Sequence, residues 1–499
     1  MLDAAPVIAE DGGMDVERPA RITQAFASFF AGEPLAAPEW PAELFAATAA
    51  SVPAYGKFLT EHGIDPASVT TAAEFRALPL LDKESYHRRY PLPELCRDGR
   101  LDGCDMIAVS SGSSGTPTIW PRSLSDELHV ARRFEQVFRD GFAAHERSTL
   151  AVVCFPLGTW VGGLFTTACV RHLAAKGYPL TVVAPGNNKA EILRVIPELA
   201  PHFDQVVLLG YPPFLKDVVD TGVAAGLDWR RHAVKLVLAG EVFSEQWRDL
   251  LAERTGMADP VRDTASLYGT ADAGVLGNET ALSVSIRRFL AGRPEVAREL
   301  FGDSRLPTLV QYDPASRFFE EQDGTLLFSG DNGIPLIRYH IADEGGVLPY
   351  ASLLDFCVRQ GFQPEVTGPE LPFVYVFGRS LFTVSFFGAN IYPENVTVAL
   401  ERAPISEWVS GKFVLETPED ADRDRFLRVT VELAPGAADD EDRAVAIAKA
   451  VRAELVRLNS EFAHYVPAER QLPRVELRPA GDPEYFPAGV KHRYTRASR

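Results

Sequence analysis

Between residues 149 and 241, short runs of β-branched and apolar residues alternate with longer stretches of helical periodicity. The runs, each bounded by Gly or Pro, are TLAVVCF, LTVVAP, QVVLLGY and AVKLVLAGE. Residues 189–199 are typical of the helices between them. Strands that alternate with helices form parallel sheets whose two faces are both covered. This pattern therefore predicts an α/β fold with a mostly parallel sheet covered by helices.

The segments on either side of this region have a different character. Residues 21–100 are predicted to be mostly helical, and the first 20 residues to form a loose arm. Residues 305–378 are rich in strand and turn signals, as in TLVQYD, TLLFSGDNG, PLIRYH and FVYVFGR. These signals indicate a β subdomain added to the large domain.

The C-terminal part reads as a separate small α+β domain. The strand-like runs KFVLE, FLRVTVEL and RVELRP accompany a helix that is predicted over residues 440–462. The predicted buried stripe of that helix comprises Val445, Ala448, Val451, Leu455, Leu458 and Phe462. We therefore expect a large N-terminal domain over residues 1–379 and a small mobile domain over residues 380–499.

Charge and cysteine content exclude several classes of partner. A net charge of −18 over 499 residues disfavours nucleic acid, because phosphate binding needs clustered Lys and Arg. The five cysteines are scattered without a CxxC pair, which argues against a disulfide framework or zinc ribbon and favours the cytoplasm. Residues 150–170 carry no charge over the length of a membrane span, but Pro and Gly interrupt them. We expect a strand, a loop and a buried helix there, and no membrane span.

The stretch SSGSSGTPT, residues 110–118, is the most informative motif. Glycine lets the backbone approach a phosphate closely, and successive N–H and hydroxyl groups donate to its oxygens. The stretch is not a Walker A loop, which needs a lysine. Taken alone, it is compatible with either a phosphate-binding loop or a flexible Ser/Gly linker.

Four further stretches contain candidate polar anchors. They are YGTAD at 268–272, DNGIPLIRYHIAD at 331–343, GR at 378–379 before LFTVSFFGANIYPENV, and the basic tail, which contains Lys491, His492, Arg493, Arg496 and Arg499. Taken singly, each stretch has a structural alternative: a turn, a buried salt bridge, an interdomain connection and a solvated chain end respectively.

The order and spacing of these motifs resemble those of the adenylate-forming enzymes, namely acyl- and aryl-CoA ligases, amino-acid adenylation domains and luciferases. SSGSSGTPT is similar to the phosphate loop SSGTTGKPT of the phenylacetate–CoA ligase branch. AGE at 239–241 resembles the GGE turn, YGTAD the YGxTE motif, and RYHIAD the RY…D motif. GRS…GANIYPENV resembles the hinge motif GRxDDxxxxxGxNxxPxxIE, and GVKHRYTR stands where the family carries its C-terminal catalytic lysine. GIDPASVTTAAEFRALPLLDK resembles the branch's N-terminal pattern, so the likeness runs from residue 50 to the C-terminus.

The resemblance implies an enzyme that joins a carboxylic acid to the α-phosphate of ATP, releases pyrophosphate and passes the acyl group to an acceptor. It implies that Lys491 and Asp272 are catalytic, that Asp272 holds Mg²⁺, and that Asp343 accepts hydrogen bonds from the ribose. The implied nucleotide-binding residues are Ser110, Ser111, Gly112, Ser113, Ser114, Gly115, Thr116, Gly240, Glu241, Tyr268, Gly269, Thr270, Arg338, Asp343 and Arg379.

Several positions depart from the family pattern. Thr116 replaces the lysine of the phosphate loop, and Ala271 and Asp272 stand in place of a threonine and the longer glutamate. Leu381 and Phe382 replace the paired acidic hinge residues. A non-catalytic protein that binds an acyl nucleotide is therefore an alternative to the enzyme, whereas an ATP-hydrolysing P-loop protein would need the missing Walker lysine.

An aromatic or hydrophobic carboxylic acid is the expected substrate. The candidates for an aromatic-lined slot lie near predicted strand ends, and they are Phe155, Trp160, Phe165, Tyr211 and Phe214. Core packing is an equal alternative for each of them. The expected acceptor is the thiol of CoA, and an amine or a carrier-protein thiol is the alternative.

Overall fold

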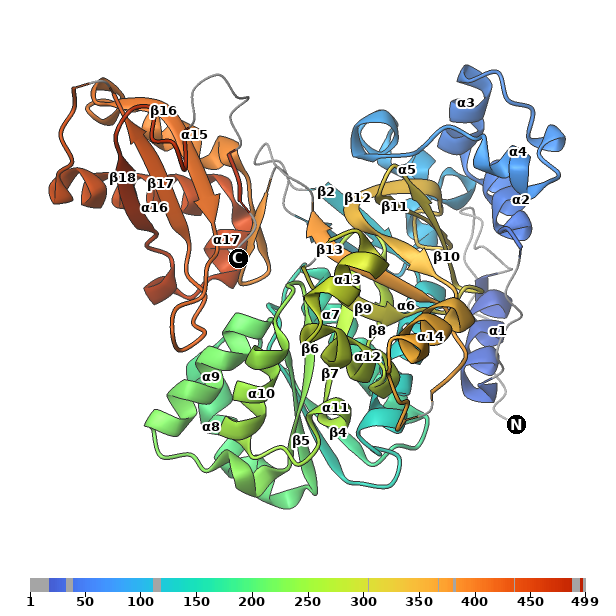
Figure 1. Cartoon of the computed structure of the whole chain (residues 1–499). Helices are drawn as coiled ribbons and strands as arrows, with labels where there is room; N and C mark the ends of the chain where they lie inside the picture. Colours follow the sequence, from blue (N-terminus) through green and yellow to red (C-terminus); the bar gives the residue numbers. More distant parts are fainter. Residues whose placement is uncertain are drawn as a thin grey trace, which may run out of the picture.

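The computed structural model describes residues 18–32, 39–110, 118–303, 305–366, 368–379, 383–434, 436–486 and 494–496. Its largest element is an 11-stranded sheet with the strand order β10-β11-β12-β13-β9-β8-β7-β6-β5-β3-β4. Helices flank this sheet, and the last part of the chain forms a small sheet with helices of its own (Figure 1).

One half of the large sheet is parallel. Its strands are β3 (Thr149–Val153), β4 (Leu180–Val183), β5 (Gln205–Gly210), β6 (Val234–Ala239) and β7 (Thr264–Thr270). All four neighbouring pairs among them run in the same direction. The predicted parallel sheet is therefore confirmed, because β3 to β6 are the four apolar runs.

Helices cover both faces of this parallel half, as predicted. Leu150 and Val152 of β3 share one core cluster with α8, α9 and α10, whereas Ala151 and Val153 share another with α6 and α7. This division follows from the strand geometry, since successive side chains point to opposite faces. The helices are α6 (Leu124–Gln136), α7 (Val161–Ala175), α8 (Lys189–Leu199), α9 (Pro212–Ala224), α10 (Glu245–Thr255) and α11 (Pro260–Asp263).

The strands of residues 305–378 continue the same sheet in antiparallel fashion. They join the parallel half through β8, where Asn278 pairs with Gln311 of β9. The predicted β subdomain is thus hydrogen-bonded to the main sheet. β8 comprises Gly274–Asn278, and the strands that follow it are β9 (Thr308–Gln311), β10 (Arg317–Gln322), β11 (Thr325–Gly330), β12 (Leu336–Leu348) and β13 (Phe373–Arg379). The helices α12 (Ala281–Ala291), α13 (Pro294–Phe301) and α14 (Tyr350–Arg359) enclose a further core cluster with them.

The N-terminal part is mostly helical, as expected. Its helices are α1 (Arg18–Ala31), α2 (Ala42–Ser51), α3 (Pro53–Glu61), α4 (Ala72–Arg76) and α5 (Leu92–Leu95). They are followed by a two-stranded antiparallel sheet of β1 (Met106–Ser110) and β2 (Thr118–Arg122). Residues 1–17 and 111–117 lie outside the described part of the chain.

The C-terminal part is a three-stranded sheet with helices, drawn in orange and red in Figure 1. It contains a hairpin of β14 (Val384–Phe386) and β15 (Ala389–Ile391), then α15 (Pro393–Leu400), β16 (Val409–Glu416), β17 (Arg428–Leu433), α16 (Glu441–Leu458), α17 (Ser460–Tyr465) and β18 (Arg474–Arg478). The three predicted strands are confirmed, since β16 includes KFVLE, and β17 and β18 lie within FLRVTVEL and RVELRP.

The single helix predicted over residues 440–462 is wrong in its extent and partly in its buried stripe. Asn459 separates α16 from α17, and its side chain caps α17 by accepting a hydrogen bond from the Phe462 amide at 3.0 Å. Within α16, Val445 is 44% exposed, while Ile447 is buried. The apolar spacing happens to continue across the break, so periodicity alone does not reveal it.

The uncharged stretch of residues 150–170 folds as the sequence predicts. It contributes β3 and the first part of α7, and both elements belong to the core. Among the described residues, no helix combines the length and the apolar character that crossing a membrane requires.

Candidate active site

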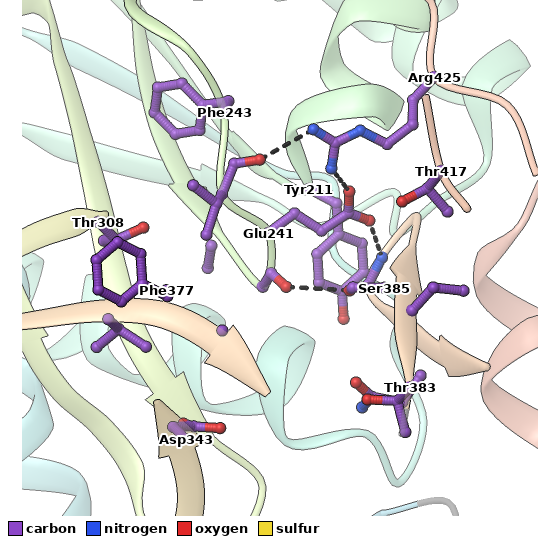
Figure 2. A pocket seen from close by; sticks show the side chains of 18 of the residues that line it. Tyr211, Glu241, Phe243, Thr308, Asp343, Phe377, Thr383, Ser385, Thr417 and Arg425 are labelled. Atoms are coloured by element: carbon purple, nitrogen blue, oxygen red, sulfur yellow. Dashed lines mark hydrogen bonds and ion pairs between the residues drawn. The ribbon is translucent and has the colours of Figure 1, made fainter. Parts of the chain in front are cut away.

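A cavity of about 1520 Å³ lies where the parallel strands end and the C-terminal part of the chain meets them. Ala239 closes β6 and Thr270 closes β7, and both line this cavity. Thr417 and Arg425 line it from the C-terminal side (Figure 2). The carboxyl ends of parallel strands are the usual ligand-binding edge of α/β sheets. This cavity is therefore the candidate active site.

Asp343 and Tyr268 meet at one side of the cavity. The Tyr268 hydroxyl donates a 2.7 Å hydrogen bond to Asp343 Oδ2, and both residues line the cavity although they are largely buried. Asp343 lies on β12 and is the register partner of Arg379 on β13. The carboxylate is thus held in place and can accept hydrogen bonds from a ligand that carries hydroxyl groups.

Asp272 occupies another corner, in the turn between β7 and β8. The Tyr339 hydroxyl donates to Asp272 Oδ2 at 2.7 Å, and Lys83 Nζ lies 3.2 Å from Asp272 Oδ1. Asp272 and Lys83 both line the cavity. This corner therefore combines a carboxylate with a nearby ammonium group.

Lys83 is a candidate site residue that the motif analysis did not single out. Its ammonium nitrogen lies 5.7 Å from the centre of the Trp120 ring, and Trp120 Nε1 donates to Ser110 Oγ at 3.1 Å. Ser110 is the first residue of the predicted phosphate loop and lines the cavity. The signal for Lys83 was present, because the N-terminal stretch that resembles the phenylacetate–CoA ligase branch ends at this lysine.

Gly240 and Glu241 form the side of the cavity nearest the C-terminal part. The Gly388 amide donates to Glu241 Oε1 at 2.6 Å, and Arg425 pairs with the same carboxylate (Figure 2). Burial raises the pKa of Glu241 above its ordinary value, although the positive charge of Arg425 acts in the opposite direction. Glu241 therefore joins the end of β6 to two segments of the C-terminal part.

Tyr211 is packed between two glycines. A Cβ atom on Gly240 would lie 2.8 Å from the Tyr211 ring, and one on Gly388 would lie 2.5 Å from it. Both glycines have φ near +80°, at 83° and 81°, a region that residues with a side chain rarely adopt. The close approach of the ring therefore requires glycine at both positions.

Of the five residues predicted for an aromatic slot, Phe155, Phe165 and Tyr211 line the cavity, whereas Trp160 and Phe214 do not. Phe155 and Tyr211 line the cavity with their ring centres 5.0 Å apart, and Phe165 lines it beside them. Trp160 lies outside the lining, where it packs against Tyr465 with a centroid distance of 4.9 Å. The cavity thus has an aromatic region close to the ends of β3 and β5.

No model of a known protein family matches the chain. Phenylacetate–coenzyme A ligase of Thermus thermophilus is 22% identical over 357 residues, which cover 71% of this chain and 72% of that protein. A solved structure of 2-hydroxyisobutyryl-CoA ligase, in complex with 2-HIB-AMP and CoA in the thioesterification state, matches with a TM-score of 0.62 and 14% identity. The match covers 97% of this chain and 92% of that one. The same ligase in the postadenylation state gives a TM-score of 0.52, 14% identity and coverages of 99% and 95%.

The chain resembles the adenylate-forming enzymes. Within them it resembles the phenylacetate–CoA ligase-like branch, as the motifs predicted. Predicted site residues that are distant in sequence line one cavity. They are Ser110, Gly240, Glu241, Tyr268, Gly269, Thr270, Asp272 and Asp343.

Arg338, which was predicted to bind the nucleotide, does not line the cavity. Its guanidinium pairs with the carboxylate of Glu320 and donates to the carbonyl of Leu78, outside the cavity lining. Two other members of the motif RYHIAD contribute to the site. Asp343 lines the cavity, and Tyr339 donates a hydrogen bond to Asp272, which also lines it.

Several predicted residues lie outside the described part of the chain. They are Ser111, Gly112, Ser113, Ser114, Gly115, Thr116 and Lys491, together with the side chain of Arg379 and the hinge residues Leu381 and Phe382. Phe486 and Thr495 are described residues that precede and follow Lys491 in the sequence, and both line the cavity. Thr495 also pairs with Leu415 of β16.

The described residues fit a Mg-nucleotide. Asp343 presents an acceptor for ribose hydroxyl groups, and Asp272 supplies a hard oxygen donor of the kind that Mg²⁺ takes together with water and phosphate oxygens. Lys83 adds a point charge suited to a phosphate group. The cavity also has room for more than a nucleotide, because ligand pockets commonly measure about 300–1,000 Å³.

Proposed function

We propose that the chain is an ATP-dependent carboxylate ligase that activates an aromatic or hydrophobic acid as an acyl adenylate. In a second step it transfers the acyl group to an acceptor, which we take to be the thiol of CoA. One observation carries the proposal: Asp343 with Tyr268, Asp272 with Lys83, and the aromatic region around Phe155 all border the same cavity.

Nucleotide binding follows from the two carboxylates. Asp343, oriented by Tyr268, would accept hydrogen bonds from the ribose, and Asp272 would hold Mg²⁺. When bound, Mg²⁺ would neutralise phosphate charge and so favour attack by a second anion, the carboxylate substrate. Lys83 lies next to Asp272 and supplies part of the positive charge that Thr116, in place of lysine, does not.

The acid is held on the apolar side of the cavity. Phe155, Phe165 and Tyr211 provide flat, rigid surfaces, which suit an aryl or alkyl group better than a charged one. The role we assign to Lys491 is to neutralise the charge that develops on the α-phosphate and the carboxylate oxygen. The expected consequence is that Lys491→Ala lowers the rate of adenylation far more than the affinity for ATP.

Two comparisons support CoA as the acceptor. The relative from Thermus thermophilus is a CoA ligase, and the similar 2-hydroxyisobutyryl-CoA ligase was solved in complex with CoA. An amine is the second candidate, because the described cations that line the cavity are all paired with carboxylates. These pairs include Arg305–Glu344, Lys412–Glu432, Arg423–Glu419, Arg425–Glu241 and Arg496–Glu484. Because these positive charges are already paired, the lining favours an uncharged or cationic acceptor over one that carries a polyphosphate.

Pyrophosphate release from Mg-ATP, measured across a panel of aryl and alkyl carboxylates, tests the proposal. We expect release that depends on the acid and is lost in Lys491→Ala. CoA and simple amines, added separately to the best acid, then identify the acceptor by thioester or amide formation. Tight ATP binding without release for any acid would instead support the non-catalytic binder.

A further inference from the structure

Side chains from three other segments contact the backbone carbonyls of the turn that carries Asp272. Arg122 Nη2, at the end of β2, donates to the carbonyl of Ala271. Asn332 Nδ2, between β11 and β12, lies 3.4 Å from the carbonyl of Asp272 itself. Arg317 Nη2, at the start of β10, lies 3.4 Å from the carbonyl of Ala273. Three successive carbonyls are therefore each contacted by a different buried side chain.

The two arginines are joined by one buried carboxylate. Asp126, in the first turn of α6, accepts from Arg122 Nη1 at 3.2 Å and from Arg317 Nη2 at 2.6 Å. Arg122, Asp126 and Arg317 are 1%, 0% and 2% exposed. We call these three residues the Arg–Asp–Arg unit. Burying three charges costs free energy, so such a unit is weak evidence of stabilisation and invites a functional explanation.

The charges around the turn leave an excess of positive charge. The Arg–Asp–Arg unit holds two cations and one anion, and the neighbouring pair Lys83–Asp272 is balanced. These five groups together therefore carry one positive charge more than negative. A phosphate group placed next to Asp272 and Lys83 would be attracted by that excess, in a buried environment where such attraction is strong.

The excess of positive charge lies close to Asp272, one of the positions at which the sequence departs from the family pattern. Thr116 removes a lysine from the phosphate loop, and Asp272 is one methylene shorter than the family glutamate. A shorter carboxylate reaches less far, so its position depends more closely on the backbone that carries it. The contacts to the carbonyls of Ala271, Asp272 and Ala273 fix that backbone.

We propose that Arg122, Asp126 and Arg317 are positioning residues that fix the Asp272 carboxylate for Mg-nucleotide and supply positive charge beneath the phosphates. The inference rests on the proposed nucleotide site, and it deepens that proposal by assigning a role to three residues outside the motifs. It predicts that the unit affects Mg-nucleotide binding more than it affects folding.

The test compares Arg122→Lys and Arg317→Lys with Arg248→Lys as a matched control. Arg248 is 0% exposed and also bridges two carboxylates, Glu245 and Glu279, but it does not contact the Asp272 turn. Lysine keeps the charge at each position but loses the planar fork that contacts two acceptors at once. Calorimetry measures ATP binding at a series of Mg²⁺ concentrations, and thermal unfolding monitors the fold.

We expect both test variants to bind Mg-ATP about tenfold more weakly than Arg248→Lys, as loss of a charge-assisted hydrogen bond implies, and to need more Mg²⁺. Their unfolding temperatures should match that of the control. Affinity equal to that of the control would overturn the inference. If either arginine variant fails to fold, Asn332→Ala, which removes only the contact to the Asp272 carbonyl, serves as the milder test with the same expected direction.

Binding and turnover separate the two proposals. If wild type binds Mg-ATP but releases no pyrophosphate with any acid, the ligase proposal fails, while the variants still decide the role of the Arg–Asp–Arg unit. If wild type binds no Mg-ATP, both proposals are contradicted.

Discussion

Lys83 Nζ lies 3.2 Å from Asp272 Oδ1, so a residue from the N-terminal helical part and one from the β7–β8 turn form an ion pair at the cavity wall. Asp272 is 3% exposed and Lys83 is 26% exposed, so the pair is only partly accessible to solvent. A ligand that brings both phosphate and Mg²⁺ would offer each partner a new counter-charge. In the proposed nucleotide-bound state, contacts to phosphate and Mg²⁺ would therefore replace the contact between Lys83 and Asp272.

Replacing Lys83 tests this relationship. Lys83→Met keeps the length of the side chain but removes the charge, and we expect kcat/KM for ATP to fall by about 10- to 100-fold, as loss of a charged hydrogen bond implies. Lys57→Met is the control, because Lys57 forms an exposed ion pair with Glu94 away from the cavity. Steady-state pyrophosphate release at varied ATP is the measurement. Equal effects of the two substitutions would contradict a role for Lys83.

Asp343 should determine recognition of the ribose. Wild type should discriminate against 2′-deoxy-ATP and 3′-deoxy-ATP, because a carboxylate that loses a hydroxyl partner is left with an unsatisfied acceptor. Asp343→Asn should bind ATP about tenfold or more weakly and lose much of that discrimination. Competition binding with the three nucleotides provides the measurement. A variant that discriminates as well as wild type would place the ribose elsewhere.

Gly388 should be required for the position of Tyr211. Gly388→Ala places a Cβ atom 2.5 Å from the ring at φ 81°, so the ring or the β14–β15 hairpin must move. Gly411→Ala is the matched control, since Gly411 has φ 86° and no atom within 4 Å of the added Cβ. Both variants carry a backbone cost of about 1–3 kcal/mol. We expect Gly388→Ala alone to raise the KM for the acid, and similar KM values in both variants would argue against Tyr211 in the acid site.

The contact between α9 and the C-terminal part should depend on pH. Burial opposes ionisation of Asp424, but the hydrogen bond and charge of Lys216, together with Arg470, lower the pKa of Asp424 below its ordinary value of 3.8. A carboxylate with a lowered pKa in the folded state contributes stability above its unfolded pKa, and this stability is lost as the pH falls.

The measurement is the free energy of unfolding of wild type and Asp424→Asn between about pH 6 and pH 2.5. Wild type should be the more stable protein at the upper end, and the difference should shrink as the pH falls below the unfolded pKa of Asp424. A difference that stays constant with pH would show that the charge of Asp424 is not responsible.

The parallel half of the sheet was predictable from the sequence because its strands are local apolar runs, and β3, β5 and β6 are buried on both faces. The attachment of the antiparallel half was not, since it depends on the pairing of Asn278 with Gln311, and periodicity does not say which strand edges meet. The break at Asn459 was missed for a similar reason. The Asn459 side chain caps α17, while the apolar spacing runs on through the break.

The candidate site was predictable where a motif residue faces the cavity, as Asp272, Asp343, Tyr211 and Phe155 do. Arg338 shares a motif with Asp343, yet its side chain is directed to Glu320 on the neighbouring part of the sheet. The Arg–Asp–Arg unit could not be predicted from spacing, because its members come from β2, α6 and β10 and meet only in the folded chain.

Direct detection of an acyl adenylate tests the central claim. The chain is incubated with Mg-ATP and the best acid of the panel without any acceptor, and the quenched mixture is analysed by mass spectrometry. The account predicts a species with the mass of acyl-AMP, formed together with pyrophosphate and absent for Lys491→Ala. ATP cleavage to ADP and phosphate, or no acid-dependent adenylate with any member of the panel, would contradict it.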